Sequence, residues 1–223
     1  MATNSGAPLV FPIGHYMGPF HPARHAAPQH YIVRVGWDTP KLPDEDHLNV
    51  WALTHGLPSQ IASVPWDRHA ILAAAKDAGM PGAEKILGTL LDLGVAAEVM
   101  PGTDQAIEFA QAYRMQSLLV GLGNLPDDPT LDGIGLPGVA PVVRVRPRVY
   151  ELWQWGHLWP SLWATCEALA EVAREVAAET DDADPAESEP EQVLDFALES
   201  LRTLVAHNAA YLDVAHTAAE SPA

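Results

Sequence analysis

A similar phrase occurs twice in this chain, about a hundred residues apart. YIVRV (31–35) is followed by NVWALTHG, and PVVRV (141–145) is followed by ELWQWGH. In both places a Val-Arg-Val strand pattern precedes a helix pattern with Trp-x-x-x-His, and internal similarity of this kind predicts a duplicated structural unit. The repeated pairs are Trp51 with His55 and Trp153 with His157.

The segments that precede the two Val-Arg-Val strands are also alike. LVFPIG (9–14) and SLLVGLG (117–123) have the apolar content of short strands, and each leads into a loop rich in Pro and Gly. Gly14 and Val33 are 19 positions apart, and Gly123 and Val143 are 20 positions apart. Nearly equal spans between similar strands favour the same local geometry in both copies.

Two further helices are expected in each copy. Asp67 is a suitable N-cap for the first of them, and Gly94 and Asn208 end the last helix of each copy with a residue that tolerates left-handed geometry. The tails VAAEV and AAYLDV that follow are expected to be wing strands. The expected helices span 67–79, 82–94, 161–179 and 191–208.

Three domain segments follow from this pattern. The first module is expected at 8–100 and the second at 117–216, and PGTDQAIEFAQAYRM begins a helix over 101–116 that links them. The acidic, Pro-containing run at 180–190 is typical of a solvated linker inside the second module.

Two strands, three helices and a closing wing form the outline of a winged helix-turn-helix. With the strands placed first, the order also resembles the small peptide-binding domains of the PqqD type, which take part in the biosynthesis of ribosomally made, modified peptides. The resemblance implies peptide recognition. The expected fold class is therefore α+β, mainly helical, with two tandem winged-helix-like modules joined by a helix. The alternative is one α+β domain in which the apparent repeat is chance.

Charge is the strongest compositional constraint. The 12 Lys and Arg residues face 29 Asp and Glu residues, which gives a formal net charge of −17. Such a surface repels phosphate backbones, so the charge disfavours nucleic acid and suits a basic partner. No apolar run reaches the roughly 18 residues of a spanning helix, and the N-terminus lacks the pattern of a signal peptide, so a cytoplasmic location is expected.

Residues with catalytic potential are few. Cys166 lies among apolar neighbours of a helix pattern, where a packed thiol is the ordinary interpretation. The glycine-rich GLGN and GIGLPG match no phosphate-binding motif, and no nucleophile elbow is present. The sequence thus predicts no catalytic residue and no cofactor, and it favours a protein that is not an enzyme.

One loop is rich in histidine. Imidazoles are good zinc ligands, but this loop holds two prolines and contains no cysteine or carboxylate, so ordinary solvated histidines are expected and a metal site is the alternative. The four residues are His15, His21, His25 and His30.

Arginines and tryptophans are the candidate binding residues. An exposed strand edge beside an apolar helix can accept an extended peptide, with arginines selecting acidic side chains. Arg144, Arg146 and Arg148 would share a face if the strand continued past Pro147; the alternative is that the arginines pair with nearby carboxylates. The tryptophans clustered between 153 and 163 indicate a contact between copies or chains, and core packing is the alternative. The predicted binding residues are Arg34, Arg144, Arg146, Trp153, Trp159 and Trp163.

These observations predict a non-catalytic binding or regulatory protein that recognises a peptide or protein partner and forms a homodimer. One alternative is a DNA-binding transcription regulator, although its candidate reading residues, Lys85, Gln192 and Arg202, stand among acids. The other alternative is a small enzyme or metal-binding protein that uses the histidine-rich loop.

Overall fold

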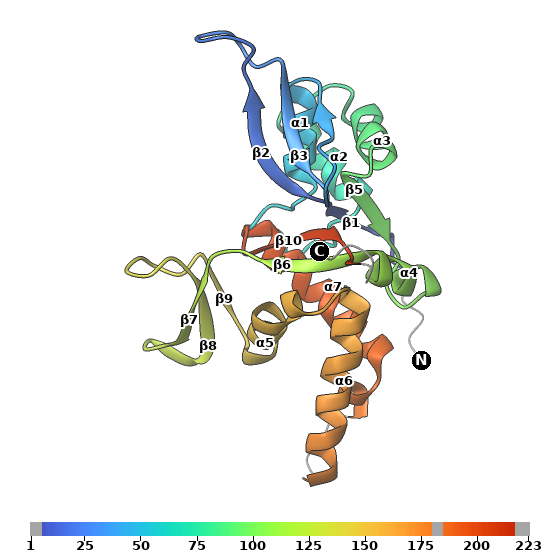
Figure 1. Cartoon of the computed structure of the whole chain (residues 1–223), viewed down its shortest axis with the longest axis vertical. Coiled ribbons are helices and arrows are strands. Elements are labelled where there is room, and N and C mark those ends of the chain that lie inside the picture. The colour runs from blue at the N-terminus through green and yellow to red at the C-terminus, as the bar shows by residue number, and fades with distance from the viewer. Residues whose placement is uncertain (1–5, 180–184, 217–223) are drawn as a thin grey trace, which may run out of the picture. The chain divides into compact units, whose positions relative to one another are not determined.

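A computed structural model describes residues 6–179 and 185–216, which form two compact units (Figure 1). Among the described residues, the first unit contains 6–100 together with Leu212–Val214. The second unit contains 101–179, 185–211 and 215–216.

The first unit begins with strands and continues with helices. Its strands are β1 (Leu9–Pro12), β2 (His15–Phe20), β3 (His30–Arg34), β4 (Lys41–Leu42) and β5 (Ala96–Val99), and its helices are α1 (Glu45–Leu53), α2 (Arg68–Asp77) and α3 (Ala83–Asp92).

Two small antiparallel sheets of the first unit enclose its core. β1 pairs with β5, and the second sheet has the order β2-β3-β4. Val33 of β3 and Leu42 of β4 are fully buried on the side of the sheet that packs on α1. Ile71 of α2 and Leu87 of α3 complete this core with 0% exposure. Burial of such side chains contributes about 1.5 to 3 kcal/mol each and is the main force that holds the unit together.

The second unit has a comparable order of elements after a leading helix. Its strands are β6 (Tyr113–Ser117), β7 (Val120–Leu125), β8 (Asp128–Gly135), β9 (Val143–Val145) and the first two residues of β10 (Ala210–Val214), whose other three belong to the first unit. Its helices are α4 (Asp104–Ala112), α5 (Pro147–Trp155), α6 (Leu162–Glu179) and α7 (Pro190–Ala206), with short 3-10 helices η1 (Gly156–Leu158) and η2 (Pro185–Ser188).

α7 is the central helix of the second unit. Its apolar residues recur at helical spacing, and Leu194, Leu198 and Leu201 are at most 2% exposed. α4, α5 and α6 pack on α7. The strands of this unit form a sheet with the order β7-β8-β9 and a two-stranded pairing of β10 with β6.

One side-chain contact is repeated in both units. The indole Nε1 of Trp51 donates a hydrogen bond to the carbonyl of Val95 at 2.9 Å, and the indole Nε1 of Trp153 donates to the carbonyl of Ala209 at 2.7 Å. Each acceptor directly follows a left-handed residue, Gly94 in the first unit or Asn208 in the second. In each unit the contact therefore joins the first helix after the sheet to the turn that ends the third helix.

The predicted fold class is wrong in its main statement. Helices occupy 42% and strands 26% of the structure, with four small antiparallel sheets, so the fold is an α+β mixture and not a mainly helical pair of winged-helix-like modules. Much of the unexpected strand content lies in β2 and β8, where Pro and Gly predicted loops. These strands alternate poorly in hydrophobicity, since β2 is largely exposed and β8 is rich in Asp and Gly, and pairing with a neighbouring strand decides their conformation.

Boundaries between the elements also differ from expectation. The predicted linking helix over 101–116 ends at Ala112 as α4, and β6 begins at Tyr113. Within the predicted acidic linker at 180–190, residues 180–184 lie outside the described residues, while 185–188 form η2. The cap at Asp67 is confirmed, since its carboxylate accepts from the Ala70 amide at 2.8 Å.

Substitution of Trp153 tests how much the repeated indole hydrogen bond contributes to the stability of the protein. We expect Trp153→Phe to lower the free energy of unfolding by about 1 to 3 kcal/mol, because the variant removes one of the two hydrogen bonds to the buried Ala209 carbonyl, leaves only the one from the Leu118 amide, and fills less space. Urea unfolding followed by circular dichroism measures the change. The control Trp37→Phe alters a tryptophan that is 83% exposed, and it should shift stability by less than about 0.5 kcal/mol. Equal stability of Trp153→Phe and the parent would contradict the assigned role.

Candidate interaction surface on the first unit

The Arg34 guanidinium takes part in a contact that stabilises the fold. Its Nη1 donates to Asp213 Oδ2 at 3.0 Å and to the carbonyl of Gly36 at 3.2 Å. The Asp213 side chain is 1% exposed, and its Oδ1 also accepts from the Gly36 amide at 2.6 Å. A buried carboxylate needs such a cation and donors to offset its lost hydration. Arg34 thus stabilises a turn, which leaves less of its guanidinium for a ligand.

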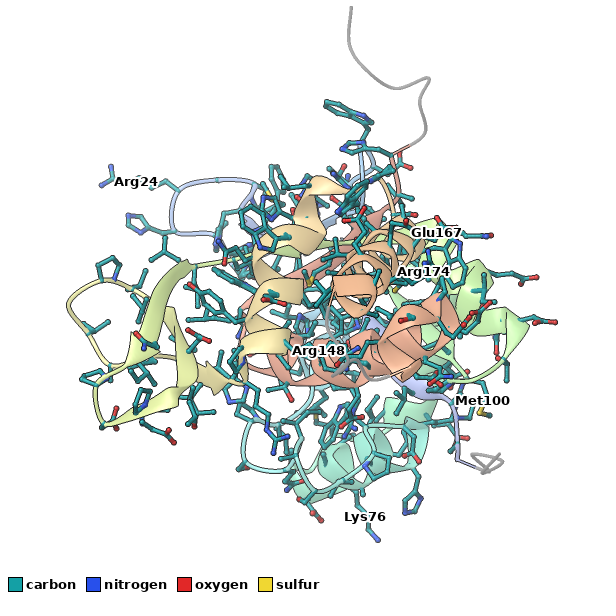
Figure 2. All side chains as sticks on the ribbon, turned by 90° about the horizontal axis from the view of Figure 1, so that it is seen from below. Arg24, Lys76, Met100, Arg148, Glu167 and Arg174 are labelled. Atoms are coloured by element: carbon teal, nitrogen blue, oxygen red, sulfur yellow. The ribbon has the colours of Figure 1, made fainter. Side chains whose placement is uncertain are left out.

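The other predicted arginines lie in the second unit. Arg144 pairs with Asp127 at 2.7 Å on the surface, and this hydrogen bond lowers the pKa of the Asp127 carboxyl. Arg146 is the exposed residue that precedes α5. The strand does not continue past Pro147, which was the condition for the three arginines to share a face: α5 begins there, and proline is well suited to the first position of a helix. Arg148 therefore lies on the helix, pairs with Glu187 at 2.8 Å and stacks over the ring of Phe196 (Figure 2).

The predicted tryptophans divide between core and surface. Trp153 is 5% exposed and belongs to the core, and Trp163 is half-buried on α6. Trp159 is 43% exposed. Together with Trp155 at 50% and Leu158 at 64%, it forms an exposed apolar cluster around η1, which we call the η1 cluster.

The four loop histidines are spread along the β2–β3 hairpin. His15 is opposite Arg34, and His30 is opposite Phe20, which places the two imidazoles about 13 Å apart along the sheet. His21 Nδ1 lies 2.8 Å from the carbonyl of Ala26, and His25 has a left-handed backbone. Across 6–179 and 185–216, no three His, Cys, Asp or Glu side chains are grouped so that they could hold a metal ion.

Candidate nucleophiles have unsuitable surroundings. Cys166 is fully buried, and burial raises the pKa of its thiol to about 12, so the reactive thiolate is not formed near neutral pH. The Ser117 hydroxyl donates to the carbonyl of Trp153, while His157 Nδ1 is 3.5 Å from Ser117 Oγ. The serine proton therefore points to a carbonyl and not to the base that would have to accept it.

An open groove of about 530 Å³ lies between α2 and the connection that precedes it. Its α2 wall consists largely of alanine methyl groups, and the Asp67 carboxylate at one end already caps the helix. Few polar groups converge in it, which distinguishes it from a typical small-molecule site.

Trp37 is a surface residue that the sequence patterns did not single out. It lies at the tip of the tight turn between β3 and β4 and is 83% exposed. Val35 and Asp38 close this turn with two backbone hydrogen bonds of 2.9 and 3.0 Å, and Gly36 supplies the left-handed residue. Because Asp213 binds the Gly36 amide, the turn is held rigidly while its indole projects outward.

The outer face of the β2-β3-β4 sheet continues this surface. Residues paired across antiparallel strands project to the same face, so the positions that alternate with buried Val33 all face outward. Phe20 and His30 stack on that face with ring centroids 4.9 Å apart, and Figure 1 shows the β2–β3 hairpin reaching beyond the helices of its own unit. We define the hairpin surface as this outer face and the adjoining turn: His15, Phe20, His30, Ile32, Arg34, Lys41 and Trp37.

The charge of this segment departs from that of the whole chain. The first 37 residues contain no Asp or Glu, although the chain has 29 of them, and they contain Arg24, Arg34 and four histidines. A count of acidic residues along the sequence is the signal that would have identified the hairpin as a distinct surface.

Comparisons of the chain with protein-family models, with curated proteins and with solved structures found no match. No helix within the described part of the chain is both long and apolar enough to cross a membrane.

The half-buried histidine His55 gives a test of the fold through pH. Its ring packs edge-on against Trp51 at 4.5 Å, and burial lowers its pKa from 6.5 to about 4. Between these values the unfolded chain binds a proton that the folded protein does not, so stability is full above pH 6.5 and falls as the pH approaches 4. We expect this residue to account for about 2 to 3 kcal/mol of the stability lost between about pH 7.5 and about pH 4.5.

Urea unfolding at both pH values measures this loss in the parent and in His55→Gln. The variant should lose correspondingly less stability on acidification. The matched control is His157→Gln, which changes the exposed histidine at the equivalent place of the second copy and should keep the parental loss. An identical loss in the parent and His55→Gln would refute the role given to His55.

Proposed function

We propose that this chain is a cytoplasmic, non-catalytic protein that binds a peptide or protein partner through the hairpin surface. The observation that carries the proposal is Trp37, an indole that is 83% exposed at the tip of a braced turn. Exposing so large an apolar side chain costs free energy in the unbound protein, and a partner that covers it recovers that free energy.

The rigidity of the turn makes the Trp37 indole a better contact residue for a partner. Tryptophan is among the residues that most often dominate protein interfaces, because it contributes a large contact area at a small cost in side-chain entropy. The Arg34–Asp213 ion pair and the Gly36 amide fix the turn before any partner arrives. A pre-formed anchor lowers the ordering cost of association.

The side chains of the hairpin surface support peptide binding better than the edges of the β2-β3-β4 sheet do. The free edge of β2 carries a β-bulge between Tyr16 and Gly18 and a proline at position 19, and β4 at the other edge has only two residues. Bulges, prolines and short edge strands hinder the addition of another strand. We therefore place recognition on the outer face and the turn, and not on a peptide added to the sheet.

The alternative functions receive less support from the structure. Arg202, which a reading helix would have to present to DNA, is 8% exposed and pairs with Glu199 on its own helix. Lys85 of α3 stands beside the exposed Glu84. An enzyme lacks an activated nucleophile at the two places considered above, Cys166 and Ser117.

Selection of short random peptides on the immobilised protein tests the proposal. We expect peptides to be enriched, and we expect Trp37→Ala to weaken their binding at least about 30-fold, the effect typical of a hot-spot residue. Fluorescence anisotropy of labelled peptides gives the dissociation constants. Leu136→Ala is the control, because Leu136 is a large apolar residue that is 55% exposed in the second unit, and it should change affinity less than about twofold.

Two results would count against this function. One is a selection that enriches no peptide. The other is a set of selected peptides that bind Trp37→Ala and the parent with equal affinity.

We further propose that the chain forms a homodimer through the η1 cluster, since two of its three exposed apolar residues are tryptophans. The double variant Trp155→Ser with Trp159→Ser should convert the dimer to a monomer, because it removes most of the aromatic area available for burial. Sedimentation equilibrium measures the mass. Val172→Ser with Val176→Ser is the control, because it removes exposed apolar groups of α6 elsewhere on the same unit. A parent protein that is monomeric throughout would refute the dimer.

A further inference from the structure

We propose that the segment bound by the hairpin surface is acidic, with carboxylates interleaved among apolar side chains. This inference rests on the proposed function and specifies the chemistry of the partner. It is carried by a separate observation, the distribution of charge over the first unit.

The hairpin surface and its loop carry two cations that no ion pair neutralises in the part of the chain that the structure describes. Arg24 is at the exposed end of the hairpin and points away from the ribbon in Figure 2, and Lys41 is exposed on β4. Among the described residues neither of them forms an ion pair, although seven other ion pairs are present. In a chain with 29 acidic residues, Arg24 on the acid-free hairpin and Lys41 on the adjoining strand β4 are therefore available to an external carboxylate.

The order of groups along the sheet suits an extended segment. Starting at the loop, Arg24 is followed by the stacked Phe20 and His30, and the pair of Ile32 and Lys41 comes next. Trp37 ends the series beyond Arg34. Cationic and apolar groups therefore alternate over a length that a short extended peptide spans at about 3.3 Å per residue.

The acidic residues nearest to this surface in the sequence flank β4. Asp38, in the same turn as Trp37, is the first acidic residue of the chain, and the next ones begin α1, where Asp44 accepts hydrogen bonds from His47. An acidic segment that docks elsewhere on the chain meets many carboxylates. The hairpin surface thus selects its partner partly through repulsion by the rest of the molecule.

The same balance favours a peptide over nucleic acid. Binding of a phosphate backbone is driven by several neighbouring cations, and its length brings further phosphates near the acidic remainder of the chain. A short peptide places its carboxylates only where Arg24 and Lys41 are, and its apolar side chains cover Phe20, Ile32 and Trp37.

Two synthetic probes of equal length test this inference, one of alternating Glu and Leu and one of alternating Gln and Leu. We expect the Glu–Leu probe to bind at least about tenfold more tightly by fluorescence anisotropy, and its affinity to fall as salt is added. The double variant Arg24→Glu with Lys41→Glu should weaken it by at least about tenfold.

The matched control is Lys76→Glu with Lys85→Glu. It makes the same change in net charge on exposed lysines of α2 and α3 in the same unit, and Figure 2 shows Lys76 far from Arg24. We expect the control to change affinity for the Glu–Leu probe less than about threefold, which represents the long-range effect of net charge alone.

Each other outcome overturns the inference. Equal binding of the two probes shows that carboxylates are not selected, and an equal loss in both double variants shows that the position of the cations is irrelevant. Tighter binding of duplex DNA, lost in Arg24→Glu with Lys41→Glu, assigns the surface to nucleic acid. If neutral peptides bind in a Trp37-dependent manner while the Glu–Leu probe does not, the acidic partner is refuted and the proposed function stands; if no peptide binds, both fail.

Discussion

An indole hydrogen bond to a helix-terminal turn organises each unit of this protein. Trp51 and Trp153 insert a large apolar ring into the core and donate to a carbonyl, at Val95 or Ala209, that also accepts from a backbone amide, Ile13 or Leu118. The first helix, the last helix and the strand that follows are thereby fixed at one point. The sheets then close on this frame, and β2-β3-β4 presents the hairpin surface on its far side.

The parts of the fold that the sequence predicted are those with a strong local signal. Caps such as Asp67 and turn residues such as Gly94 and Asn208 act within a few positions along the chain, so their pattern is sufficient. β2 and β8 were missed because their conformation depends on a partner strand and their own residues are typical of loops. Repetition of the Trp-x-x-x-His pattern was visible, but it identified a shared core contact and not a winged helix.

The interaction surface was harder to predict because it depends on which charged side chains already form ion pairs within the protein. Arg34 and Arg144 are equivalent in the sequence, yet one holds a buried aspartate from the far end of the chain and the other pairs on the surface with Asp127. No spacing in the sequence indicates that Asp213 lies beside Arg34. Trp37 was overlooked for the opposite reason, since a single tryptophan in a turn has no periodic neighbours to draw attention to it.

The contacts of Asp213 and Val214 with the turn at Gly36 have a consequence for the biosynthesis of the protein. Any side chain at position 36 would place its Cβ 2.6 Å from the Val214 side chain. Glycine is therefore needed at this position for the turn to pack against the end of β10. A ribosome makes Arg34 of the β2–β3 hairpin 179 residues before it supplies Asp213. Until Asp213 is added, the nascent chain cannot present a braced indole, and partners that require it encounter only molecules in which β10 has already docked.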